Sequence, residues 1–118
     1  VEGAKRLLED ALCVQAAGAF SVVLECVPAK LAALVTDRLN ITTIGIGAGA
    51  QCDGQVLVYQ DMLGMYQDFS PKFVKHYASM SAGFLEAFNR YDEEVKNSTF
   101  PALEHTFKID DEVIEKLY

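Results

Sequence analysis

The sequence is poor in the residues that build a disulfide framework or a zinc site. Its three cysteines, Cys13, Cys26 and Cys52, are an odd number and show no CxxC spacing. The two histidines, His76 and His105, are far apart in the sequence, and His76 is expected on the surface of a helix or at an interface. The cysteines therefore predict reduced thiols in a cytoplasmic protein, and the histidines do not predict a metal site.

Basic charge and long apolar runs are also scarce. Ten lysines and arginines stand against 17 aspartates and glutamates, which gives a net charge of −7. No basic stripe is available to neutralise nucleic-acid phosphates or an anionic membrane surface. No apolar run approaches the roughly 18 residues of a membrane-spanning helix. We therefore expect neither a nucleic-acid partner nor a membrane partner.

What the sequence does contain is enough apolar material for one folded domain. Hydrophobic residues make up 51% of the 118 residues, which is typical of a chain with a buried core. Apolar periodicity and turn signals predict helices over 5–17, 28–39 and 83–96, a further helix from Ser70-Pro71 onward, and strands over 19–27, 41–46 and 55–59. This alternation predicts an α/β fold with a parallel sheet.

The domain is expected to comprise residues 1–97, with residues 98–118 as an acidic tail that carries a short helix. Three parallel strands make a thin sheet with two bare edges, so we expect its remaining strands to lie elsewhere. The chain also starts at Val1 without methionine. Both features suggest a piece of a longer protein, or one chain of a split one.

Glu25 is the most informative residue of the chain. It lies near the end of the apolar run 22–27. This run ends directly before Pro28, a residue that suits the first position of a helix. The run is predicted to be a buried strand, and the carboxyl ends of parallel strands are where α/β enzymes carry their chemistry. The alternative is that Glu25 caps a helix or pairs with a basic side chain.

A glycine-rich loop over 47–54 follows the second predicted strand. Residues 45–50 read GIGAGA, which matches the GxGxxG/A pattern of dinucleotide sites. A strand-like segment follows, where that fingerprint requires a helix, so a dinucleotide site is disfavoured. Two interpretations remain open. The loop lets its backbone approach an anionic ligand at the mouth of a barrel, or the glycines only allow tight packing.

Several blocks of the sequence resemble one enzyme family in order and spacing. The chain is similar to the carboxyl-terminal half of ketopantoate hydroxymethyltransferases, on the blocks 23–28 (VLECVP), 44–49 (IGIGAG), 53–58 (DGQVLV), 71–73 (PKF) and 100–105 (FPALEH). The resemblance covers nearly all of the chain. It implies strands six to eight of a (β/α)8 TIM barrel of the phosphoenolpyruvate/pyruvate type, and assembly as a decamer of two pentameric rings.

The resemblance also implies a reaction and a role for Glu25. The family transfers a one-carbon unit from 5,10-methylenetetrahydrofolate to 3-methyl-2-oxobutanoate, which gives ketopantoate for pantothenate synthesis. The family's catalytic glutamate falls on Glu25, which would be the general base that removes the proton at C3 of the keto acid. The enolate that forms must be stabilised, and the family uses a Mg²⁺ ion held by the ketone and carboxylate of the substrate.

The family's metal-binding acids, its substrate-binding serine and its active-site lysine belong to the amino-terminal half of the barrel. None has a counterpart here, so this chain is expected to need that half as a partner and to be inactive alone. We do not assign metal ligation to Asp53 or Asp61, which are expected to fix loops. Gln60 stands where many family members have histidine, and no folate-binding residue is predicted.

Two other functions remain open. One is a keto-acid aldolase or lyase of the same barrel superfamily that works without folate. The other is a non-catalytic segment that serves as the assembly surface of an oligomer, with candidate interface residues Phe73, Tyr77, Phe84, Phe88 and Tyr91.

Overall fold

The computed structural model describes residues 1–117. The chain divides into two compact units, Val1–Ser79 and the residues from Met80 onward, and each is described by itself. The first unit contains helices α1 (Glu2–Ala16), α2 (Ala29–Arg38) and α3 (Tyr59–Met62), and strands β1 (Ser21–Glu25), β2 (Thr42–Ile46) and β3 (Gly54–Gln55).

The boundaries of α1 and α2 follow from local chemistry. After α1, Gly18 adopts φ +93°, and its N–H donates to the carbonyl of Gln15 at 2.9 Å. Glycine adopts this left-handed conformation without steric cost, so Gly18 suits the end of a helix. Pro28 occupies the N-cap of α2 and not its first helical position, one residue away from the prediction.

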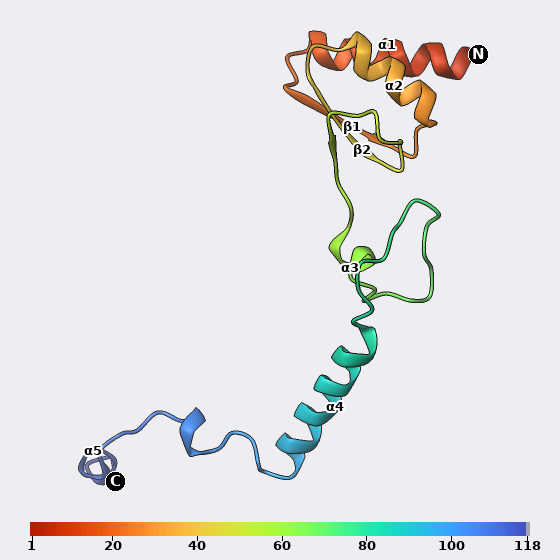
Figure 1. Cartoon of the computed structure of the whole chain (residues 1–118). Coiled ribbons are helices and arrows are strands. Elements are labelled where there is room, and N and C mark those ends of the chain that lie inside the picture. The colour runs from red at the N-terminus through yellow and green to blue at the C-terminus, as the bar shows by residue number, and fades with distance from the viewer. Residues whose placement is uncertain (118) are drawn as a thin grey trace. The chain divides into compact units, whose positions relative to one another are not determined.

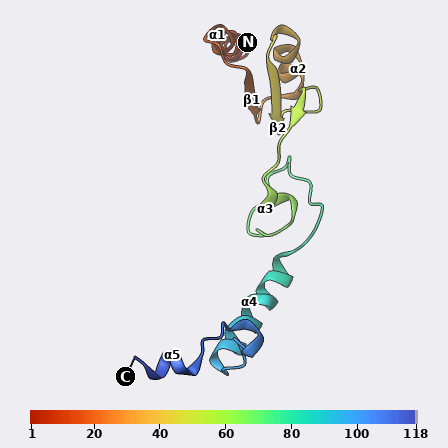
Figure 2. The same cartoon turned by 90° about the vertical axis from the view of Figure 1, so that its left-hand side faces the viewer.

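The three strands form one parallel sheet in the order β1-β2-β3, which confirms the predicted parallel arrangement. Val23 pairs with Ile44 and Glu25 with Ile46. Figures 1 and 2 show β1 and β2 running side by side, with α1 and α2 packed next to each other. A sheet of this order places the carboxyl ends of β1 and β2 at the same edge.

The core lies between the sheet and the helices α1 and α2. It contains Leu24 of β1 together with Ala32 and Val35 of α2. Because side chains alternate across a strand, Val23 and Glu25 point to the face opposite Leu24. That face is open in the part of the chain described, and Val23 is 55% exposed. The prediction of a fully buried first strand is therefore wrong for Val23 and Glu25.

The third predicted strand is much shorter than expected. Pairing with β2 ends at Gln55, apart from one more hydrogen bond from the N–H of Val56 to the carbonyl of Gly45 at 3.0 Å. The chain then turns into α3 at Tyr59. The predicted strand over 55–59 is wrong beyond Gln55.

The helix predicted from Ser70-Pro71 is absent from the described structure. Only one turn forms there, closed by Val74 N–H to Pro71 C=O at 2.9 Å. Tyr77 N–H donates instead to Met62 C=O at 2.7 Å, so a contact with α3 replaces the helical hydrogen bond. His76 is consequently not on a helix, and its Nε2 lies 3.3 Å from the Oγ of Ser70, the residue at which the predicted helix would begin.

The second unit contains α4 (Ser81–Lys96), a 3₁₀ turn η1 (Leu103–His105) and α5 (Asp111–Glu115). The predicted helix over 83–96 and the short acidic helix near the end are both confirmed. Large apolar side chains of α4 are exposed, among them Leu85, Phe88 and Tyr91. No helix among residues 1–117 has both the length and the apolar character needed to cross a membrane.

Candidate functional site

The candidate site lies at the edge of the sheet where β1 and β2 end. Cys26 directly follows Glu25, and its N–H donates to the carbonyl of Ile46 at 2.9 Å. Cys26 adopts φ +54°, a left-handed conformation that is uncommon for a residue with a side chain. This turn ends the pairing of the two strands and starts the connection to α2.

Glu25 is exposed, on the open face of the sheet. The ion pairs among the described residues lie within α1 and α4 and do not include Glu25. The N-cap of α2 is Pro28, and no side chain caps that helix. In the part of the chain that the structure describes, Glu25 thus takes neither of the structural roles considered above, a helix cap or half of a salt bridge.

The glycine-rich loop is held against neighbouring segments by close contacts. Gly47 has φ +65°, and a Cβ atom there would lie 2.8 Å from Cδ1 of Phe73. Gly49 has φ +81°, and its Cβ would lie 2.6 Å from the Cβ of Ala29 at the start of α2. The Nε2 of Gln55 donates to the carbonyl of Gly49 at 2.8 Å. These glycines are required for close packing, which is one of the two interpretations left open. The loop is followed by the strand β3, whereas a dinucleotide site needs a helix there.

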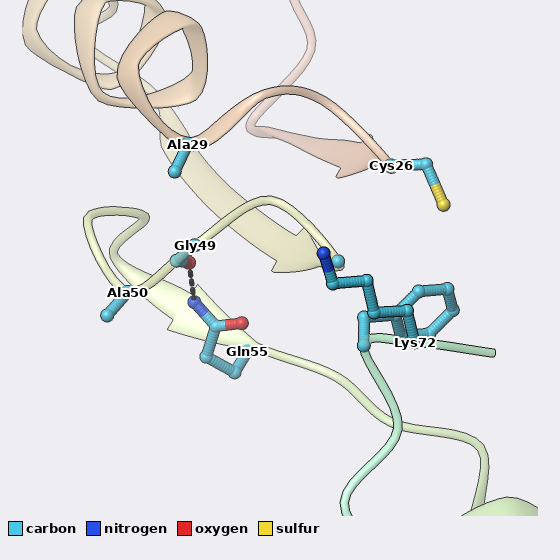
Figure 3. A pocket seen from close by; sticks show the side chains of 8 residues that line it. Cys26, Ala29, Gly49, Ala50, Gln55 and Lys72 are labelled. Atoms are coloured by element: carbon cyan, nitrogen blue, oxygen red, sulfur yellow. Dashed lines mark hydrogen bonds between the residues drawn. The ribbon is translucent and has the colours of Figure 1, made fainter.

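The same loop borders a hollow of about 800 Å³. Its lining includes Cys26, Ala29, Gly47, Gly49, Lys72 and Phe73. Figure 3 shows the side chain of Lys72 extended across this hollow. Glu25 is not among the lining residues, although its neighbour Cys26 is.

Asp53 holds the loop between β2 and β3. Its Oδ2 accepts hydrogen bonds from the N–H and the hydroxyl of Thr43, at 2.7 and 3.0 Å. The N–H of Asp53 donates to Thr43 Oγ1 at 3.2 Å. Since the proton of Thr43 Oγ1 is used toward Asp53, the hydroxyl of Thr36, 2.9 Å away, must be the donor in that pair.

These hydrogen bonds lower the pKa of Asp53 from its ordinary value of 3.8, with the backbone N–H of Thr43 as the largest cause and its hydroxyl next. The acceptor oxygen of Asp53 is committed to Thr43, which is fully buried. Asp53 is therefore a loop-fixing residue, as expected from the sequence.

The described residues offer no complete metal centre. Within residues 1–117, no three His, Cys, Asp or Glu side chains are grouped so that they could hold a metal ion. Asp61 belongs to the short helix α3 and Asp53 to the loop after β2. Cys13, Cys26 and Cys52 are free thiols.

Sequence reasoning missed Lys72 and Phe73 as residues of this edge. The sequence predicts both in a helix that begins at Ser70-Pro71, and Phe73 as a candidate interface residue. The available signal was the glycine pattern, because a glycine with a left-handed backbone leaves room for a ring. The sequence did not show which ring would occupy that room.

Comparison with known proteins gives a consistent result. The family model described as ketopantoate hydroxymethyltransferase matches residues 1–103. The chain is 63% identical over 117 residues to a 3-methyl-2-oxobutanoate hydroxymethyltransferase of Enterococcus faecalis, and 59% identical over 117 residues to one of Clostridium novyi. Each match covers 99% of this chain and 42% of the relative, so the chain spans less than half the length of these relatives.

Proposed function

Because this chain belongs to the ketopantoate hydroxymethyltransferase family, we propose that it takes part in hydroxymethyl transfer to 3-methyl-2-oxobutanoate. The one-carbon donor is 5,10-methylenetetrahydrofolate, and the product is ketopantoate, a precursor of pantothenate. The chain contributes the general base, and the remaining groups of the active site come from polypeptide outside these residues. The high identity to relatives bearing this activity in their names supports the proposal.

The proposed fold of the whole enzyme is a (β/α)8 barrel, in which β1, β2 and β3 are strands six, seven and eight. Three features support this arrangement: the strands are parallel, they follow chain order, and α1 and α2 share a core with the sheet. In such a barrel the helices cover the outside and the opposite face lines the interior. The open face with Val23, Ile44 and Glu25 would then face the interior.

The position of Glu25 is the observation that carries the proposal. It is the last residue of β1, on the face opposite the core residue Leu24 and next to Cys26, which lines the hollow. Active sites of these barrels lie at the carboxyl ends of their strands. A carboxylate there can remove the C3 proton of the keto acid, which is acidified by the adjacent ketone.

Mg²⁺ is proposed as the group that stabilises the enolate. The described residues lack a set of ligands for it, so the ligands are expected on polypeptide outside this chain. When bound, the ion would polarise the ketone of the substrate. What the present residues contribute is the base and the walls of the neighbouring hollow.

Assembly into a decamer and a cytoplasmic location complete the proposal. The exposed apolar side chains of α4, which include Leu85, Phe88 and Tyr91, favour burial against other polypeptide in the whole enzyme. They are also the observation that favours the second candidate, a purely assembling segment. The three free thiols are of the kind that a reducing compartment maintains.

Replacement of Glu25 by glutamine in the intact enzyme tests the main proposal. We expect kcat for ketopantoate formation to fall about 10²- to 10⁴-fold, because the general base is lost. The rate at which the C3 hydrogen of the keto acid exchanges for deuterium, measured by NMR in the absence of folate, should fall by the same factor. The matched control is Glu9→Gln, an exposed carboxylate of α1, which should leave both rates unchanged. Normal turnover by Glu25→Gln would remove Glu25 from the mechanism.

A further inference from the structure

The hollow beside the carboxyl ends of β1 and β2 has a mostly apolar lining and one basic side chain. Cys26, Ala29, Gly47, Gly49 and Phe73 give it a mostly apolar wall. Its volume of about 800 Å³ lies within the range of pockets that enclose drug-sized ligands.

Lys72 supplies the only basic side chain of that wall, as far as residues 1–117 are concerned. It takes no part in the ion pairs of the described residues, which lie within α1 and α4. Figure 3 shows its side chain extended across the hollow. In a chain of net charge −7, an unpaired ammonium group at a cavity favours an anionic ligand.

Phe73 adds an aromatic surface next to this charge. Its ring packs on the backbone of Gly47, where a Cβ atom would lie 2.8 Å from Cδ1. Phe73, Gly47 and Gln55 also border a second hollow, on which Lys75 and Tyr77 lie. There the ammonium of Lys75 sits over the ring of Tyr77, 5.0 Å from its centre.

We infer that this hollow binds the folate co-substrate, with Lys72 pairing with its glutamate carboxylates and Phe73 contacting one of its aromatic rings. The inference rests on the proposed function. A reduced folate combines flat rings with terminal carboxylates, the two features that Phe73 and Lys72 complement. Cys26, the neighbour of the proposed base Glu25, also lines this hollow. A folate bound in the hollow would therefore hold its one-carbon unit near the keto acid.

The experiment compares substitutions of Lys72 in the intact enzyme. We expect Lys72→Met to raise the KM for 5,10-methylenetetrahydrofolate about 10- to 100-fold, the usual effect of losing a charge-assisted hydrogen bond. The kcat at saturating folate should stay near that of the unchanged enzyme. Lys72→Arg should restore most of the affinity. Lys75→Met is the matched control, because Lys75 is a cation of the same segment that does not line this hollow.

Exchange of the C3 hydrogen, measured without folate, separates the two substrates. The rate of exchange and the KM for 3-methyl-2-oxobutanoate should be unchanged in Lys72→Met. A raised KM for the keto acid with an unchanged KM for folate would mean that Lys72 binds the keto acid, and would overturn the inference. Unchanged values for both substrates would overturn it as well. If the unaltered enzyme neither exchanges the hydrogen nor transfers the one-carbon unit, the proposed function itself fails.

Discussion

Asp53 and Thr43 show how one side chain can fix a loop beside a site. The buried Thr43 uses its N–H, its hydroxyl proton and a lone pair in contacts with Asp53. Removal of the Asp53 carboxylate takes the acceptor away from the N–H and the hydroxyl of Thr43, which is costly because Thr43 is buried. The arrangement holds the start of β3 in register with β2.

The lowered pKa of Asp53 predicts a pH dependence of stability. A carboxyl whose pKa is lower in the folded state stabilises the fold above its ordinary pKa of 3.8. That contribution is lost as the pH falls through the lowered pKa. The difference in free energy of unfolding between the unaltered chain and Asp53→Asn should therefore be constant from pH 7 to about 5, and should shrink below the ordinary pKa of 3.8.

Urea unfolding at a series of pH values, followed by circular dichroism, measures this difference. Glu9→Gln is the control, because Glu9 is an exposed carboxylate of α1 outside the Asp53 network. Its unfolding free energy should run parallel to that of the unaltered chain. A difference for Asp53→Asn that stays constant down to pH 2 would contradict the role assigned to this hydrogen-bonded carboxylate.

Helices and strands with strong local signals could be predicted, and those governed by distant contacts could not. The apolar periodicity of α1, α2 and α4 and the β-branched character of β2 located these elements to within a few residues. Ser70-Pro71 carries an equally good local signal for a helix. It does not produce one because Tyr77 donates its N–H to Met62, a contact that no local pattern reveals.

Helix α2 depends on one face for its attachment to the sheet. Val35 is completely buried in the core, whereas its neighbour Leu34 is 41% exposed. We expect Val35→Ala to lower the free energy of unfolding by about 1.5–3 kcal/mol, through lost apolar burial and the cavity left behind. Leu34→Ala should cost clearly less, although it removes a larger side chain. Equal losses in thermal or urea unfolding would mean that α2 does not pack as described.

Over the whole chain, the parts of the site differ in how visible they are in the sequence. Glu25 was visible because an acid at the end of an apolar run is unusual, and the glycine loop because its pattern is compact. Lys72 and Phe73 were not, since they line the hollow beside Gly47 from more than 20 positions further along the chain. Whether Lys72 lines the hollow depends on the path of the backbone between Gly47 and Lys72. The helix predicted from Ser70-Pro71 does not form on that path.

The open face of the sheet leads to a prediction for the complete molecule. Val23 is largely exposed there, Glu25 beside it has no partner among the described residues, and those residues include no group of ligands for a metal. We therefore expect the 118-residue chain alone to form no detectable ketopantoate.

Co-expression with the part of the Enterococcus faecalis relative that this chain does not cover should restore turnover, since the chain is 63% identical to the part it does cover. The restored activity should fall in Glu25→Gln by the same factor as in the intact enzyme, and should be retained in Glu9→Gln. Turnover by the chain alone would show that residues 1–118 already contain every group that the reaction needs.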